Sequence, residues 1–227
     1  MIKIENVEVH GFQPAIRGMR NPKNSWDRSD SYWHDIKDYN DCDPGEQFRE
    51  YRIGENDYSL MMRLAKAGSE HAKYRRMIVC WFDCTAPLYW WAEADTYKVG
   101  TVRNSCSKMH KSHSKEFTID DFSHEHLTYY DHDGELCRDF KDELEGLIDE
   151  LNFARELFNE TGDKKWWWQM IQLIPSNYNQ RATIMLNYEV LSNIYRQRKN
   201  HKLDEWRTFC QWIKTLPYSE LITLEEE

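Results

Sequence analysis

The spacing of apolar residues divides the chain into segments with two different periods. Residues 2–9 alternate apolar and polar positions, which predicts a half-buried strand. In residues 139–161 the apolar positions recur every three or four residues, which predicts an amphipathic helix. The apolar stripe of that helix consists of Phe140, Leu144, Leu147, Leu151, Ala154 and Phe158. These two patterns indicate a mixture of helix and sheet.

Shorter patterns predict the remaining elements. Helices are expected at 56–68, 86–98, 166–175, 177–200 and 202–217, and strands at 76–84 and 115–119. Pro87 is expected at the first position of its helix, and Gly68 and Gly100 are expected to end helices. Residues 20–56 predict an irregular polar excursion, and residues 110–138 a mostly loop segment. The sequence therefore predicts a single α+β domain over residues 1–227, mainly helical with a small antiparallel or mixed sheet.

Charge and composition limit the kinds of molecule that we expect this protein to bind. The chain has 227 residues, ten of them Trp, and a net charge of −9. A polyanion needs a basic surface, so a long nucleic acid is not expected as the partner, although a small phosphate ligand needs only a few cations. No apolar run predicts a membrane span, the N-terminus lacks a signal-peptide pattern, and the six Cys show no paired framework. We expect reduced thiols and a cytoplasmic protein without a membrane partner.

The predicted helix 177–200 carries polar residues at a notable spacing. Asn187 and Arg198 are eleven residues apart, which is three helical turns, with Leu191 and Ile194 between them on nearly the same face. A face that combines an amide, a guanidinium and apolar residues is typical of a pocket wall. The same spacing also fits a surface helix with ordinary salt bridges.

Three other features have a functional and a structural interpretation. The His residues between 110 and 132 include His-x-x-His and His-x-His spacings, which suit a metal-dependent hydrolase, but their polar surroundings favour a solvated loop and no metal is expected. Cys106 lies close to Lys108, which would favour a reactive thiolate, although no His partner can be named. The run 166–168 is three consecutive Trp, whose rings cannot face one way on a helix, so we expect a subunit interface there.

The order of these motifs resembles the flavin-dependent thymidylate synthases over most of the chain. "AGSEH" ends at His71, the strand 76–84 follows, and Ala86-Pro87 opens the next helix, as in that family. The family's Arg-His-Arg signature falls on residues 96–98, and its later Ser-x-Arg-Tyr falls on residues 106–109. After Pro175, the family's Asn-x5-Asn-x4-Arg pattern matches 187, 193 and 198, before "HKLDEW" and Pro217.

The resemblance implies a role for each matching residue. The expected flavin contacts are His71, Thr96, Tyr97, Lys98, Thr101, Asn187 and Asn193, with Asn187 near the isoalloxazine ring. The expected substrate-binding residues are Glu93, Ser105, Cys106, Ser107, Lys108 and Arg198. Arg198 would hold the uracil ring, and Arg198 and Lys108 are the expected catalytic residues. No metal ligand is implied.

The chain also departs from the family pattern. Thr96-Tyr97 replaces an Arg-His pair, Glu93 replaces a Gln, and Ile171 replaces an Arg. Lys108 keeps a cation but lacks the bidentate geometry of Arg. The resemblance implies a homotetrameric transferase of nucleotide biosynthesis that methylates dUMP, or a related deoxyuridine nucleotide, with FAD, NADPH and methylene-tetrahydrofolate. The altered signature leaves a non-catalytic nucleotide-binding or sequestering protein as the alternative.

Overall fold

The computed structural model describes residues 2–35, 49–107 and 113–224 of the chain. Helices and strands are mixed along it, with short 3-10 helices (η) in the loops. The strands are β1 (Lys3–His10), β2 (Tyr32–Asp35), β3 (Arg49–Arg52), β4 (Val79–Pro87), β5 (Val102–Ser105), β6 (Thr128–Tyr130), β7 (Leu136–Asp139) and β8 (Asn179–Asn187). The helices are α1 (Phe12–Arg20), α2 (Glu55–Lys66), α3 (Leu88–Ala94), α5 (Lys141–Thr161), α6 (Lys164–Leu173), α7 (Tyr188–Arg198), α8 (Asp204–Ile213) and α9 (Glu220–Thr223). The 3-10 helices are η1 (Asn21–Lys23), η2 (Trp26–Arg28), η3 (Lys73–Met77) and η4 (Ile119–Asp121).

The chain divides into two compact units. Unit 1 consists of residues 1–6, 82–96 and 103–184, and unit 2 of residues 7–81, 97–102 and 185–227. A four-stranded sheet has the order β1-β4-β8-β5, and each of its strands contributes residues to both units. Two further sheets are two-stranded antiparallel pairs, β2 with β3 and β6 with β7. The expected α+β class with small sheets is confirmed.

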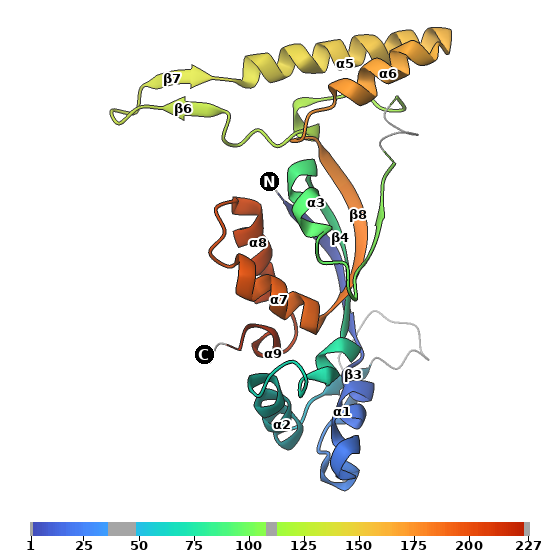
Figure 1. Cartoon of the computed structure of the whole chain (residues 1–227), viewed down its shortest axis with the longest axis vertical. Helices are drawn as coiled ribbons and strands as arrows, with labels where there is room; N and C mark the ends of the chain where they lie inside the picture. Colours follow the sequence, from blue (N-terminus) through green and yellow to red (C-terminus); the bar gives the residue numbers. More distant parts are fainter. Residues whose placement is uncertain (1, 36–48, 108–112, 225–227) are drawn as a thin grey trace. The chain divides into compact units, whose positions relative to one another are not determined.

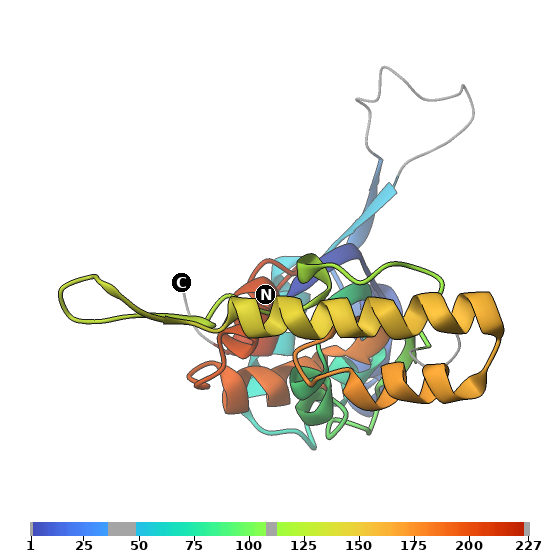
Figure 2. The ribbon, with the colours of Figure 1, turned by 90° about the horizontal axis from the view of Figure 1, so that it is seen from above.

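In unit 1, α5 and α6 lie side by side (Figures 1 and 2) and supply most of a local core. Leu151 and Met170 are fully buried where the two helices meet, together with Leu144, Ile148 and Ala154 of α5. The predicted helix 139–161 is therefore confirmed within two residues. One position of its stripe differs, because Phe140 is 48% exposed and lies just before α5. The buried residue that completes the stripe is Ile148.

The three consecutive Trp residues lie on α6 and point in different directions, as expected for a helix. Trp166 and Trp167 pack against the α5–α6 core, whereas Trp168 is 46% exposed. Its ring meets the Trp167 ring edge-on at a centroid distance of 4.8 Å. The subunit interface expected at this surface stays a prediction.

In unit 2, a buried ion pair joins α1 to α2. Arg20, at the end of α1, donates from Nε to Asp57 Oδ1 of α2 at 2.6 Å, and both side chains are at most 4% exposed. The other Asp57 oxygen accepts hydrogen bonds from the hydroxyl groups of Ser29 and Ser31 and from the backbone N–H groups of Asp30 and Ser31. This carboxylate therefore fixes the loop after α1 against α2.

The predicted helix 177–200 is wrong in its first half. Residues 179–187 form strand β8, in which Gln180, Ala182, Ile184 and Leu186 are buried at every second position. Asn187 is not inside a helix but caps α7, where its Oδ1 accepts the N–H of Val190 at 3.0 Å. An Asn side chain at this position satisfies one of the otherwise unpaired N–H groups of the first helical turn.

Three other predicted segments need correction. Residues 115–119 form no strand, and Ile119 begins η4, while β6 and β7 form a hairpin in the expected loop. The expected excursion at 20–56 contains η1, η2, β2 and β3, and its residues 36–48 lie outside the described residues. Pro87 ends β4 and caps α3, so the helix expected at 86–98 begins at Leu88 and ends at Ala94.

Candidate functional site

Unit 2 contains a cavity of about 710 Å³ beside the start of α7. Its wall includes Asn187 and Asn193, two of the residues expected to contact a flavin. Asn193 Oδ1 accepts a hydrogen bond from Arg196 at 3.0 Å, and Asn187 Oδ1 is used in the helix cap. Each side chain therefore keeps its –NH₂ group as a donor for a ligand. The volume lies within the range of about 300–1000 Å³ typical of small-molecule sites.

The signature loop between α3 and β5 contributes Val99 and Gly100 to the same wall. Gly100 has a φ of +79°, and a Cβ atom there would lie 2.6 Å from the Asn187 amide nitrogen. A side chain at this position would therefore displace the amide. The next residue, Thr101, has a buried hydroxyl group without a hydrogen-bond partner among the described residues.

The charged residues of this cavity were not found by the sequence reasoning. Arg75, Arg76 and Lys199 all line the cavity, and Arg76 is exposed. Arg75 is only 4% exposed, and its guanidinium pairs with Glu189 at 2.7 Å. The adjacent Arg75–Arg76 pair, directly before an apolar strand, was the available signal in the sequence.

Arg75 also attaches the helix α9 to this cavity. Its Nη1 donates to Ser192 Oγ and to the backbone oxygen of Leu221, both at 3.1 Å. Ser192 Oγ in turn donates to the backbone oxygen of Ile222 at 2.8 Å. The segment 222–224 forms part of the cavity wall, so α9 is held there by specific hydrogen bonds.

Arg198, expected to hold a uracil ring, lies in a cluster at the other end of α7. Its Nε donates to the Tyr97 hydroxyl group at 3.0 Å, and its guanidinium lies 4.9 Å from the centre of the Trp206 ring. Its Nη1 is 3.0 Å from His201 Nε2, and the Tyr97 hydroxyl group donates to Gln197. Tyr97 and Arg198, which are far apart in sequence, are thus in direct contact within unit 2. Lys98, beside Tyr97, is exposed.

The candidates in unit 1 lie on α3 and β5 or directly after them. Thr96 Oγ1 donates to the backbone oxygen of Glu93 at 2.7 Å and so completes the last turn of α3. Cys106 N–H donates to the backbone oxygen of Arg181 at 2.9 Å, and the Cys106 oxygen accepts from the Gln180 side chain at 2.6 Å. These bonds hold the backbone where β5 ends at Ser105.

Arg103 stabilises the same part of unit 1. Its guanidinium pairs with both oxygens of Asp95 and lies 4.4 Å from the centre of the Trp91 ring. Cys106 and Ser107 are exposed, and Lys108 lies outside the described residues.

Two expectations concern His residues. His71 is exposed and lines a second, larger cavity of unit 2, whereas the lining of the Asn187 cavity does not include it. Among residues 2–35, 49–107 and 113–224, no three His, Cys, Asp or Glu side chains are grouped as metal ligands would be. His110, the first His of the predicted cluster, falls outside these ranges.

No helix in the described parts of the chain is long and apolar enough to span a membrane.

The fold identifies the class of protein that the chain resembles. It is the fold of the flavin-dependent thymidylate synthases, as the motif order predicted. The chain is similar to Thymidylate Synthase X (ThyX) from Helicobacter pylori, whose crystal structure contains FAD and dUMP, with a TM-score of 0.66, 14% identity and 98% coverage of both chains.

A second similar structure comes from Streptomyces cacaoi. It is the UMP/dUMP methylase PolB bound with 5-Br dUMP, with a TM-score of 0.58, 14% identity, and coverage of 99% of this chain and 95% of that chain. No protein-family model matches the sequence, and no curated protein matches it. The similarity of this chain to the two solved structures is therefore a similarity of fold.

Proposed function

We propose that this protein binds FAD and a pyrimidine deoxynucleotide and transfers a one-carbon group to that nucleotide. The observation that carries the proposal is the Asn187 cavity, which lies in a fold shared along 98% of the chain with an FAD- and dUMP-bound synthase. The proposal includes the specific reaction, which is reductive methylation of dUMP. It also includes a homotetrameric assembly and a cytoplasmic location.

The residues of the cavity fit FAD on chemical grounds. The –NH₂ groups of Asn187 and Asn193 match carbonyl acceptors of a flavin ring, and Arg76 and Lys199 supply positive charge for a pyrophosphate. The unpartnered hydroxyl group of Thr101 is a further polar group beside the cavity wall. His71 and Lys98 remain proposed flavin contacts, as do Thr96 and Tyr97 of the signature loop.

Within this proposal the chain binds and orients the reactants. Bound reduced FAD would supply the hydride, with NADPH as electron source and methylene-tetrahydrofolate as carbon donor. Arg198 would donate to the carbonyl oxygens of a uracil ring, and Tyr97 and Trp206 would fix the plane of its guanidinium. Ser105, Cys106, Ser107 and Lys108 would contact the nucleotide, with Lys108 as its phosphate cation. Positioning of this kind supplies much of the rate enhancement when a cofactor carries the chemistry.

The absorption spectrum of the protein tests flavin binding. Purified protein should carry flavin or take up FAD at about tens of micromolar, which corresponds to a binding free energy of about −6 kcal/mol. Asn193→Ala should weaken FAD binding about tenfold, since it removes one hydrogen bond to the ligand. Asn200→Ala is the matched control, because Asn200 is exposed and lies outside the cavity lining. Colourless protein that takes up no FAD would refute the proposal.

A second function, nucleotide binding without catalysis, is favoured by the altered signature loop. Thr96 completes the last turn of α3, and the Tyr97 hydroxyl group bonds to Gln197 and Arg198, so both residues are engaged in contacts within the chain. In that case deoxyuridine nucleotides should raise the melting temperature without flavin. Formation of the methylated nucleotide from dUMP in the presence of FAD, NADPH and methylene-tetrahydrofolate would exclude it.

A further inference from the structure

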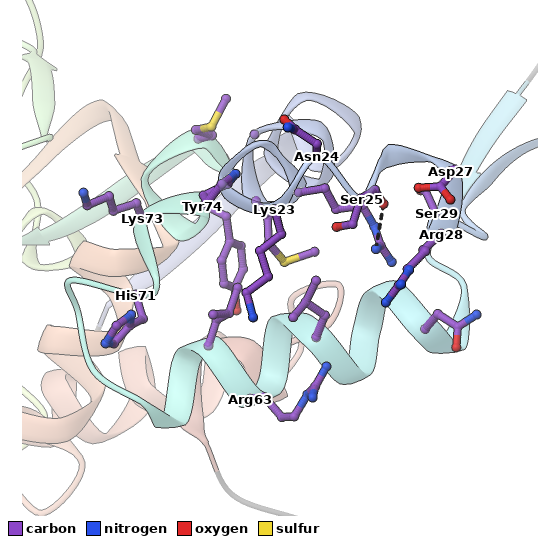
Figure 3. A pocket seen from close by; sticks show the side chains of 18 of the residues that line it. Lys23, Asn24, Ser25, Asp27, Arg28, Ser29, Arg63, His71, Lys73 and Tyr74 are labelled. Atoms are coloured by element: carbon purple, nitrogen blue, oxygen red, sulfur yellow. Dashed lines mark hydrogen bonds between the residues drawn. The ribbon is translucent and has the colours of Figure 1, made fainter.

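The larger cavity of unit 2, about 1400 Å³ in volume, is separate in its lining from the Asn187 cavity. It lies between the loop that follows α1 and the helix α2 (Figure 3). The loop supplies Lys23 and Arg28, and α2 supplies Arg63. Figure 3 shows these three side chains reaching toward the same space. None of the three makes an ion pair among the described residues.

Three cations that face one space repel one another unless an anion lies between them. Three acidic residues, Asp27, Asp30 and Glu70, also line the cavity, but none of them pairs with these three cations among the described residues. Glu70 lies 3.8 Å from the His71 ring. Both oxygens of Asp30 accept backbone N–H groups at the start of α2, from Asn56 and Asp57. Asp27 points away from α2 in Figure 3. The positive charge of the three cations is therefore available to a ligand.

The loop that carries two of these cations is fixed in place. The buried Asp57 carboxylate accepts hydrogen bonds from Ser29 and Ser31 on the loop and from Arg20 before it. Arg20 also donates to the backbone oxygen of Ser25 at 3.1 Å. A preformed loop loses little conformational entropy when a ligand binds, which raises the affinity that a given set of contacts provides.

The cavity also has an apolar part. Met19 and Met77 line it together with Leu60 and Leu64 of α2. The flexible, polarizable Met side chains adapt to flat or irregular ligand surfaces. A ligand that fits this combination has several negative charges at one end and an apolar or aromatic group at the other.

We propose that this cavity is a second ligand site that binds a nucleoside polyphosphate, with its phosphate chain held by Lys23, Arg28 and Arg63. Arg63 and Arg28 can each make two parallel hydrogen bonds to phosphate oxygens, and Lys23 adds a point charge. The base and sugar would lie against Leu60, Leu64 and the two Met side chains. His71, which stays a proposed flavin contact, also lines this cavity, so the two proposals share that one residue.

The test is a thermal-shift and calorimetric titration of the full chain with ATP and with inorganic triphosphate, without added divalent cation. Both probes should raise the melting temperature, and ATP should bind more tightly than triphosphate. Arg63→Gln and Lys23→Gln should each weaken ATP binding about tenfold, the loss expected for one charged hydrogen bond. The melting temperature without ligand should not change, because both side chains are exposed and neither makes an ion pair within the described parts of the chain.

Arg17→Gln is the matched control, because Arg17 is an exposed cation of α1 that does not line the cavity. It should leave ATP binding unchanged. Binding that weakens equally in all three variants would overturn the proposal, since it would show only attraction to net charge. Absence of any shift at millimolar ATP would also overturn it.

A competition with FAD separates this site from the flavin site. FAD at saturation should leave ATP binding intact, and Asn193→Ala should weaken FAD but not ATP. If FAD displaces ATP and Arg63→Gln weakens both, the cavity is part of the flavin site and the proposal of a second site is wrong. Failure to bind FAD at all, with ATP binding retained, would refute only the flavin proposal.

Discussion

Replacement of Asp57 by Asn tests the buried ion pair of unit 2. Asp57 is 0% exposed and its carboxylate accepts five hydrogen bonds, two of them at 2.6 Å. In Asp57→Asn the buried Arg20 guanidinium loses its counter-charge, and the amide nitrogen meets donors instead of offering them an acceptor. Removal of one partner of a buried ion pair costs about 3–5 kcal/mol. For a chain of this size, that corresponds to a melting temperature lower by about 10 °C.

The assay is thermal and urea unfolding followed by circular dichroism. Asp27→Asn, at an exposed position of the same loop, is the control and should stay within about 0.5 kcal/mol of the wild type. The double variant Arg20→Gln with Asp57→Asn should recover part of the loss, because no buried charge is left unpaired. A melting temperature for Asp57→Asn within about 2 °C of the wild type would refute the reasoning.

The Asp57 carboxylate should also make the stability of the folded protein depend on pH. Burial raises the pKa of Asp57, but hydrogen bonds from Ser29, Ser31 and Arg20, and the charge of Arg20, outweigh burial and lower it below its ordinary value. A group with a lowered folded-state pKa contributes stability above its unfolded pKa and loses it as the pH falls through the folded value. The stability difference between wild type and Asp57→Asn should therefore shrink below about pH 4. A difference that grows with acid would contradict this sign.

Three further predictions concern the core, the cavity and the thiols. Leu151→Ala should destabilise the α5–α6 core by about 2–5 kcal/mol in urea unfolding, because Leu151 is fully buried there. Gly100→Ala should weaken FAD uptake in a spectroscopic titration, because the added Cβ meets the Asn187 amide and φ is positive; unchanged uptake would contradict the contact. Cys106 should react with a thiol reagent in the native protein at pH 8, whereas Cys80, whose pKa burial raises to about 12, should react only after unfolding.

The periods of 2 and 3.6 residues predicted the elements in which they run without interruption. Helix α5 was found within two residues of its observed ends because one face of it is buried at Leu144, Ile148, Leu151 and Ala154. Strand β1 was found equally closely from its alternating sequence, although none of its eight residues is buried. Strand β8 was missed because Gln180, a polar residue, occupies one of its buried positions. That side chain is satisfied by the backbone oxygen of Cys106, a partner 74 residues away that the local pattern does not show.

In the candidate site, too, the local sequence did not show contacts between residues that are far apart in the chain. The Asn-x5-Asn-x4-Arg spacing falls on two elements, because Asn187 ends β8 and caps α7, whereas Asn193 and Arg198 lie within α7. It could not show that Asn187 and Asn193 line a cavity while Arg198 contacts Tyr97, because that depends on the signature loop. The cations Lys23, Arg28 and Arg63 lacked a sequence signal, because two segments bring them to one cavity.

The attachment of α9 has a practical consequence for work with this protein. Arg75 and Ser192 bind the backbone oxygens of Leu221 and Ile222, and residues 222–224 border the Asn187 cavity. A truncation before residue 221 would therefore open one side of that cavity and leave the buried Arg75 with fewer acceptors.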